Sequence, residues 1–261
     1  MRGLDQGLMQ EIVSVLLSSG GQFADVYFQD MSARQVEAES GRVERISTVR
    51  ERGVGLRIIK DLVTHFATTV DLTPSALLDL ARNLASGAGK KGGPRVVRLE
   101  SAPPGPLPAG EDPTRVPLDE KAKMVMEAID TLNGFDGRLV QVKTVFRDSS
   151  VMVQVANSDG VLAVDTRGYG IFLVQVVASD GEHVQVGYEP VGGTGGYDVF
   201  RALDPGAVAR TAARRALTML EAPEAPSGRM SVGPKEARSL PRASSDRLSA
   251  SGSFRRRLPR W

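Results

Sequence analysis

The stretch SVMVQVANSDGVLAVDTRGYGIFLVQVVASDG, Ser150–Gly181, decides the fold class of this 261-residue chain. Its β-branched and aliphatic residues recur in short runs, as is typical of strands. Two turn signals, Ser158–Gly160 and Asp180-Gly181, follow the runs and predict hairpins. Strands joined by such short turns are antiparallel, so the stretch favours an α+β fold over a doubly wound one. The predicted strands are Ser150–Asn157, Gly160–Arg167 and Gly170–Ser179.

Helical patterns flank this stretch on both sides and complete a module over residues 118–226. The pattern before it runs from Leu118 to Leu132, with acids at its start where the helix dipole favours them. After it, Asp204 is the predicted N-cap and Pro205 the first residue of a second helix. The remaining predicted parts are the strands Arg138–Phe146 and His183–Pro190 and a flexible glycine loop, Gly192–Gly196.

Residues 1–87 repeat the same order of helix, antiparallel strands and helix. Apolar residues at helical spacing from Leu4 to Leu17 predict the opening helix. The closing helix has Thr73 as its predicted N-cap, Pro74 at its first position and Gly87 at its end. The predicted strands are Phe23–Asp30, Ala33–Ser40, Arg42–Arg50, Glu51–Asp61 and Val63–Val70, with a turn at Gly41 and a bulge or close approach at Gly53 and Gly55.

Two segments lack a helical or strand period. Residues 88–117 are rich in Gly and Pro, which predicts an extended linker between the modules, with Val96–Glu100 as a short edge strand. Residues 227–261 hold nine basic and two acidic residues, a net charge of +7, whereas residues 1–226 carry −5. We therefore predict a disordered basic tail on a mildly acidic body.

No motif in the sequence identifies a catalytic, cofactor-binding or metal-ligating residue. The chain has no cysteine, and its two histidines, His65 and His183, each lie in a strand pattern. A zinc site needs three or four ligands, so two strand histidines are the simpler interpretation. No Gly-x-Ser-x-Gly elbow is present, and Gly192–Gly196 lacks the Lys-Ser/Thr of a phosphate-binding loop.

Five segments together resemble the TldD/PmbA family of metallopeptidases. They occur in the family's order between about Gln22 and Met230, and the glycine loop before Tyr197 looks more like TldD than its partner TldE (PmbA). No single segment is specific to the family, but the occurrence of all five in this order is. The segments are QFADVYFQD (22–30), ERGVGLRII (51–59), VANSDGVLAVDTRGYGIFLVQVVASDGE (155–182), GGTGGYDVF (192–200) and AARRALTMLEAPEAPSGRM (212–230).

The resemblance implies a cytoplasmic TldD/TldE heterodimer that degrades unfolded peptides. In the family, a catalytic domain follows the two N-terminal modules and carries His-Glu-x-x-x-His, whose histidines bind zinc and whose glutamate activates the metal-bound water. In this sequence no histidine follows His183, so none of these residues can be assigned here. We expect a chain truncated before the catalytic domain and inactive alone. Our hypothesis for the residues after Met230 is an out-of-frame translation, with a genuine linker or a splice-like variant as the alternative.

Two other readings stay open. The chain could be a non-catalytic module that binds a peptide or a TldE-like partner through exposed sheet edges. It could also associate with nucleic acid through its tail, although the tail offers only Phe254 and Trp261 for stacking, which argues against this reading. No apolar run reaches the roughly 20 residues that span a bilayer, and no signal peptide is recognised, so we predict a cytoplasmic protein without a membrane partner.

Overall fold

The computed structural model describes residues 3–89, 92, 95–103, 110–223 and 228. The predicted α+β class is confirmed: helices pack on a mixed sheet of seven strands. The predicted tail, apart from Gly228, and ten of the thirty residues of the predicted linker, 88–117, lie outside the described residues. The elements in chain order are α1 (Gln6–Leu17), β1 (Phe23–Glu39), β2 (Arg42–Lys60), β3 (Val63–Thr69), α2 (Pro74–Gly87), β4 (Glu100–Ser101), the 3-10 turn η1 (Pro113–Arg115), α3 (Leu118–Thr131), β5 (Leu139–Asn157), β6 (Val161–Ser179), β7 (Val184–Thr194), α4 (Asp198–Arg201) and α5 (Pro205–Leu220).

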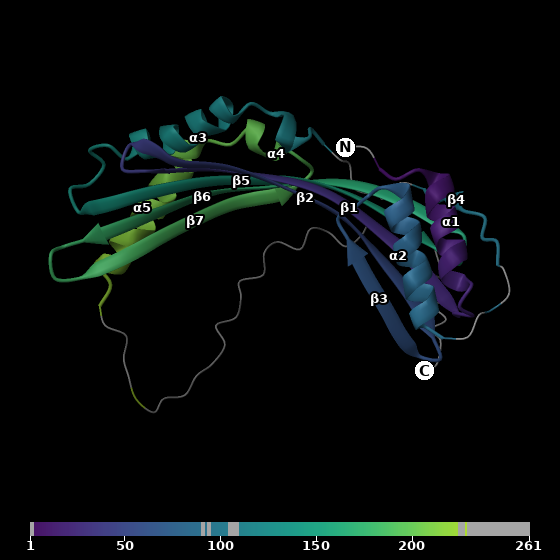
Figure 1. The fold of residues 1–261 in the computed structure, drawn as a ribbon. Coiled ribbons are helices and arrows are strands. Elements are labelled where there is room, and N and C mark those ends of the chain that lie inside the picture. Colours follow the sequence, from purple (N-terminus) through teal and green to yellow (C-terminus); the bar gives the residue numbers. More distant parts are fainter. Residues whose placement is uncertain (1–2, 90–91, 93–94, 104–109, 224–227, 229–261) are drawn as a thin grey trace, which may run out of the picture. The chain divides into compact units, whose positions relative to one another are not determined.

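The strands of the two modules join in a single sheet (Figure 1). Its order is β3-β2-β1-β5-β6, and both β7 and β4 pair with β6. All neighbours are antiparallel except β4 and β6, which are parallel. The pairing of β1 with β5 runs from Asp25↔Asn157 to Glu39↔Lys143 and so links the modules along most of both strands. This pairing was not predicted from the sequence.

Four strands are about twice as long as predicted, because pairs of predicted strands are continuous. Phe23–Asp30 and Ala33–Ser40, for example, form the single strand β1. The turn between β1 and β2 is where the sequence placed it, with Ser40 at φ 51° and Gly41 at φ 79°. The close approach predicted at Gly55 is present, because a Cβ at this position would lie 3.1 Å from the Phe66 ring.

Both helix groups cover the same face of the sheet, at opposite ends of the long strands (Figure 1). Even-numbered residues of β1 are buried at both ends, under α1 and α2 at one end and under α3 at the other. Since alternate residues of a strand point to opposite faces, these residues share one face. The even-numbered buried residues of β1 are Ala24, Val26, Phe28, Asp30, Val36 and Ala38.

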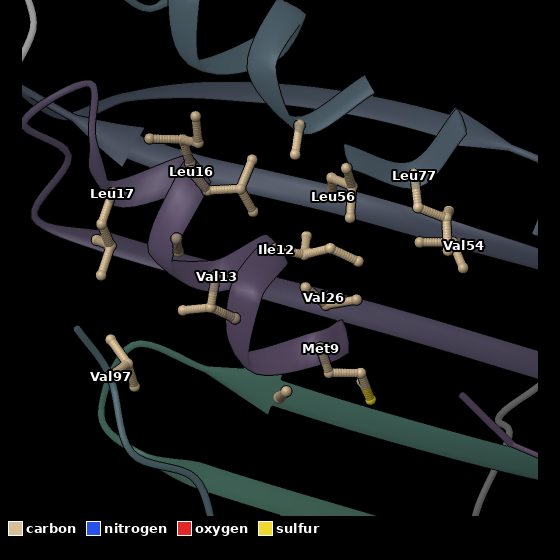
Figure 2. Packing of buried hydrophobic residues seen from close by; sticks show 14 of the residues in the cluster. Met9, Ile12, Val13, Leu16, Leu17, Val26, Val54, Leu56, Leu77 and Val97 are labelled. Atoms are coloured by element: carbon tan, nitrogen blue, oxygen red, sulfur yellow. The ribbon is translucent and has the colours of Figure 1, made fainter. Parts of the chain in front are cut away.

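The first core lies under α1 and α2 and is almost wholly aliphatic (Figure 2). Asp5 caps α1 by accepting from the backbone N–H of Leu8 at 3.1 Å. Each fully buried aliphatic side chain contributes about 1.5–3 kcal/mol. The members drawn and labelled in Figure 2 are Met9, Ile12, Val13, Leu16, Leu17, Val26, Val54, Leu56, Leu77 and Val97.

The second core lies under α3, α4 and α5 and combines aromatic rings with a close-packed alanine helix. Asp204 caps α5 as predicted, accepting from the N–H of Ala207 at 2.8 Å. α5 approaches β7 so closely that a Cβ on Gly187 would lie 1.9 Å from the carbonyl oxygen of Ala212. The principal members are Val36, Val125, Ile129, Phe146, Phe172, Val174, Val176, Tyr197, Phe200, Ala209, Ala212, Ala213 and Ala216.

Candidate functional site

The two histidines of the chain lie on separate elements. His65 is part of β3, and His183 directly precedes β7, with its Nδ1 3.5 Å from an oxygen of Asp180. Within the described ranges, no group of three or more metal-ligating side chains comes together. The described residues therefore do not fit a zinc site.

A polar belt crosses the helix-covered face between the two cores. At its β2 side, Asp30 is fully buried and its carboxylate accepts hydrogen bonds from the guanidinium of Arg50 at 3.1 and 2.8 Å. Arg52 adds an ion pair at 3.2 Å. The hydrogen bonds from Arg50 hold the pKa of Asp30 below its usual range. The residues of the polar belt are Asp30, Ser32, Arg34, Arg50, Arg52, Asp148 and Ser150.

A buried ion pair closes the belt against the second core. The ammonium of Lys121, on α3, donates to the carboxylate of Asp148, on β5, and to the carbonyl oxygen of Pro113 at 2.7 Å. Both side chains of the pair are fully buried. Burial raises the pKa of Asp148 and lowers the pKa of Lys121, because desolvation disfavours both charges. The pair ties α3 and η1 to the sheet, which is a structural role.

Tyr197 packs beside this pair. Its ring lies 5.9 Å from that of Phe146 and 6.0 Å from that of Phe200, and the guanidinium of Arg201 lies 5.4 Å from its centroid. Burial raises the pKa of Tyr197 to about 12, so its hydroxyl stays protonated at neutral pH. Arg201 is in turn held by Glu111 through hydrogen bonds at 2.9 and 2.8 Å.

The prediction of a flexible glycine loop over Gly192–Gly196 is wrong. Residues through Thr194 belong to β7, because their backbone pairs with β6. Gly195 and Gly196 form a turn with φ 109° and 80°, where glycine avoids a side-chain clash. The N–H of Gly195 donates to the carbonyl of Gly168 at 3.2 Å, so the turn is anchored. These glycines allow close backbone packing, and no phosphate-binding loop results.

The opposite face of the sheet carries no helix within the described part of the chain. Odd-numbered residues of β1, β5 and β6 line this helix-free face, and several large apolar ones are exposed there. Three hollows lie on it, of about 590, 580 and 1050 Å³. Its apolar members include Tyr27, Val49, Phe66, Val151, Val153, Val155, Tyr169 and Ile171.

Neither the polar belt nor the helix-free face is among the features predicted from the sequence. A signal for the face was present: in VMVQVA (Val151–Ala156) valines occupy every odd position, while Met152 and Ala156 are apolar at even positions. A strand that is apolar on both faces needs cover on both. No comparable signal existed for Lys121 and Asp148, which are 27 residues apart and meet only in the fold.

Two family models match the chain in order. Residues 24–88 match the PmbA/TldA metallopeptidase domain 1, and residues 111–220 match the PmbA/TldA metallopeptidase central domain. The chain belongs to the TldD/PmbA metallopeptidase family. The resemblance inferred from the sequence is therefore confirmed.

Curated relatives of this TldD/PmbA-family chain carry matching descriptions. A metalloprotease of Methanothermobacter thermautotrophicus is 25% identical over 215 residues, which are 81% of this chain and 46% of the relative. The metalloprotease TldD homolog of Haemophilus influenzae is 27% identical over 218 residues, 80% of this chain and 45% of the relative. The chain thus spans about half the length of the curated relatives it matches.

Solved structures share the fold. TldE from Thermococcus kodakarensis superposes with a TM-score of 0.62 at 15% identity, covering 80% of this chain and 47% of that one. A proposed modulator of DNA gyrase from Thermotoga maritima gives 0.68 at 15% identity, covering 85% and 50%. No helix in the described part of the chain is long and apolar enough to cross a membrane.

Proposed function

We propose that this chain is the N-terminal, non-catalytic region of a TldD-type zinc peptidase that acts on unfolded peptides together with a TldE-like subunit in the cytoplasm. The observation that carries the proposal is the ordered match to the first and central domains of a metallopeptidase. The 261 residues contain no His-Glu-x-x-x-His, so zinc and the general base would come from residues outside this sequence. The chain alone is then inactive.

The structure supports a binding role for this region. The helix-free face is broad, hollowed and partly apolar, with Tyr27 and Val49 41% and 49% exposed. Exposed apolar patches of this kind mark interaction surfaces. In a two-subunit peptidase, such a face would contact the catalytic region, the TldE-like subunit or the substrate.

The first test is a chemical one on the purified chain. Zinc is quantified by mass spectrometry after dialysis against buffer with added zinc, and cleavage of a reduced, unfolded protein substrate is followed. We expect less than a stoichiometric amount of zinc and no cleavage. Stoichiometric zinc with cleavage would overturn the claim that the catalytic residues lie outside this sequence.

The second test reads the gene beyond the codon for Ser227 in all three frames. We expect one frame to give an apolar strand followed by His-Glu-x-x-x-His. If no frame does, the peptidase proposal fails for this gene. The alternative, a non-catalytic module that binds a peptide or a TldE-like partner, would then be favoured, because the helix-free face and the exposed strand edges remain to be explained.

A further inference from the structure

Strand β3 is the outermost strand on the β2 side of the sheet (Figure 1). It pairs with β2 along its whole length, from Val63↔Lys60 to Thr69↔Val54, and with no other described strand. Residues 3–89, which include β3 and the segments on both sides of it, are described without a gap. Within the described part of the chain, the outer side of β3 is therefore a free sheet edge of seven residues, about 24 Å long at roughly 3.4 Å per residue.

The direction of the backbone groups of β3 follows from its neighbours. The carbonyl of Ile59, on β2, accepts from the N–H of Gln22 at 2.9 Å and so points towards β1. Backbone groups alternate in direction along an antiparallel strand, so the even-numbered residues of β2 bond to β3. Those residues lie opposite the odd-numbered residues of β3. The N–H and C=O groups that point away from the sheet therefore belong to Thr64, Phe66 and Thr68.

This edge lacks the features that usually protect a sheet edge from pairing. Natural sheets protect their edges with charged side chains, proline or a covering element. At the opposite edge, the guanidinium of Arg215 donates to the carbonyl of Tyr188 on β7 at 2.7 Å, and Pro190 has no N–H. β3 itself, VTHFATT, contains no Asp, Glu, Lys, Arg or Pro. Its backbone groups are therefore available to an added strand.

The surroundings of the β3 edge are apolar in the middle and acidic at both ends. The side chain of Phe66 is 62% exposed, and Val70, directly after the strand, is 83% exposed. Asp61 lies just before β3 and Asp71 just after it, and both are exposed. A strand added to β3 would have its central residues beside Phe66 and its ends near the two carboxylates. These surroundings fit an extended segment with an uncharged centre and a basic residue near each end.

A second copy of the chain fits this edge less well. Antiparallel pairing of two β3 strands about Phe66 would bring Asp61 of one copy near Asp71 of the other, at both ends of the pair. Like charges that face each other across paired strands are destabilising. The charges at the ends of β3 therefore favour a basic peptide over a second copy.

We propose that the β3 edge binds an extended cationic peptide as an added strand. The backbone groups of Thr64, Phe66 and Thr68 supply the hydrogen bonds, and the carboxylates of Asp61 and Asp71 select basic residues at the ends. Strand addition of this kind takes its affinity from the main chain and its specificity from side chains. The inference rests on the peptide-binding role proposed above and names the class of peptide, an unfolded basic segment.

The test measures binding of a fluorescent eleven-residue peptide to the full chain by anisotropy at low ionic strength. The peptide is Lys-Ser-Thr-Val-Thr-Val-Thr-Val-Thr-Ser-Lys with blocked ends, and its matched control has Glu in place of both Lys. Thr68→Pro removes an outward N–H, and proline is tolerated where an edge N–H faces outward. Thr68→Val keeps that N–H. We expect Thr68→Pro to weaken binding at least about ten-fold, Thr68→Val to stay within about two-fold, and the glutamate peptide to bind about ten-fold more weakly.

A second variant tests the charges and keeps the result decisive if Thr68→Pro does not fold, as judged by circular dichroism. Asp61→Asn with Asp71→Asn removes both carboxylates. The amide oxygen that replaces the Asp71 carboxylate can still accept from the N–H of Thr73, a bond of 3.0 Å in the unchanged chain. We expect this double variant to bind the lysine and glutamate peptides equally. An undiminished preference for the lysine peptide would overturn the proposal.

Three other outcomes would also overturn the proposal, in distinguishable ways. Equal binding of the lysine peptide to a folded Thr68→Pro chain would leave peptide binding elsewhere on the molecule. Dimerisation of the unchanged chain that Thr68→Pro abolishes, measured by sedimentation, would place a second copy on this edge. No binding to the unchanged chain would overturn both the site and the peptide-binding role, while the peptidase proposal still depends on the gene frames.

Discussion

The two cores lie on one face of one sheet but are built differently. The first core is aliphatic, and its helices α1 and α2 present leucine, isoleucine and valine to the strands. The second core holds the aromatic cluster of Phe146, Tyr197 and Phe200, an alanine-rich helix against Gly187, and the buried Lys121–Asp148 pair at its border. Aliphatic cores tolerate volume-conserving changes. Close backbone contacts leave no room for added atoms, and a buried charge that loses its partner is strongly destabilising. We therefore expect the second core to be the more sensitive to single substitutions.

The largest expected effect is on the buried ion pair. Lys121→Met leaves the carboxylate of Asp148 buried without its partner and should lower the free energy of unfolding by about 3–5 kcal/mol. Chemical denaturation measures this loss. The double variant Lys121→Met with Asp148→Leu should recover most of it, because both charges are gone. A double variant as unstable as the single one would show that the pair itself, rather than its uncompensated charge, holds the second core.

The next effect is on the close approach of α5 to β7. Gly187→Ala forces a methyl group against the Ala212 carbonyl and should cost about 1–3 kcal/mol. The matched control is Gly137→Ala, where an added Cβ has nothing within 4 Å. We expect that variant within about 0.5 kcal/mol of the unchanged chain. Equal melting temperatures for the two variants would mean that α5 shifts freely and that the second core is not tightly packed.

A smaller difference in stability is expected between substitutions at the N-cap residues of α5 and α2. Asp204→Ala removes a side-chain cap from α5 and should cost about 1 kcal/mol. Thr73 occupies the N-cap position of α2 but makes no side-chain cap bond, since its hydroxyl donates to Asp71 at 2.8 Å. Thr73→Ala should therefore cost less than Asp204→Ala in thermal unfolding. The reverse order would contradict this assignment of the caps.

The smallest effect is the pH dependence of the belt. The pKa of Asp30 is lowered in the folded state, so its contribution to stability is present above the unfolded pKa of about 4 and is lost as pH falls towards the folded pKa. The side chains of Arg50 and Arg52 are 56% and 39% exposed, so solvent screens the interaction. Between pH 7 and pH 3 the melting temperature should fall more for the unchanged chain than for Asp30→Asn. If the melting temperatures of the two proteins fell in parallel with pH, the pKa of Asp30 would be the same in the folded and unfolded states.

Local signals in the sequence were enough for the four long helices α1, α2, α3 and α5, whereas the short helix α4 was not predicted. Asp204 and Pro205 predicted the start of α5, and apolar spacing predicted α1, because caps and helical periodicity act within a few residues. The hairpin turns at Gly41 and Gly160 were also correct. The glycines before Tyr197 led to the wrong prediction of a loop, because a glycine run is typical of loops and also of strands that pack closely.

The sequence by itself determined the α+β class, the family and the hairpin turns at Gly41 and Gly160, because these depend on residues near one another along the chain. Only the tertiary structure decided that β1 pairs with β5, that both helix groups cover one face and that Lys121 meets Asp148. Alternation fixes which face a side chain occupies but carries no information about which strand lies alongside. That choice depends on contacts between residues more than a hundred positions apart, as for Asp25 and Asn157.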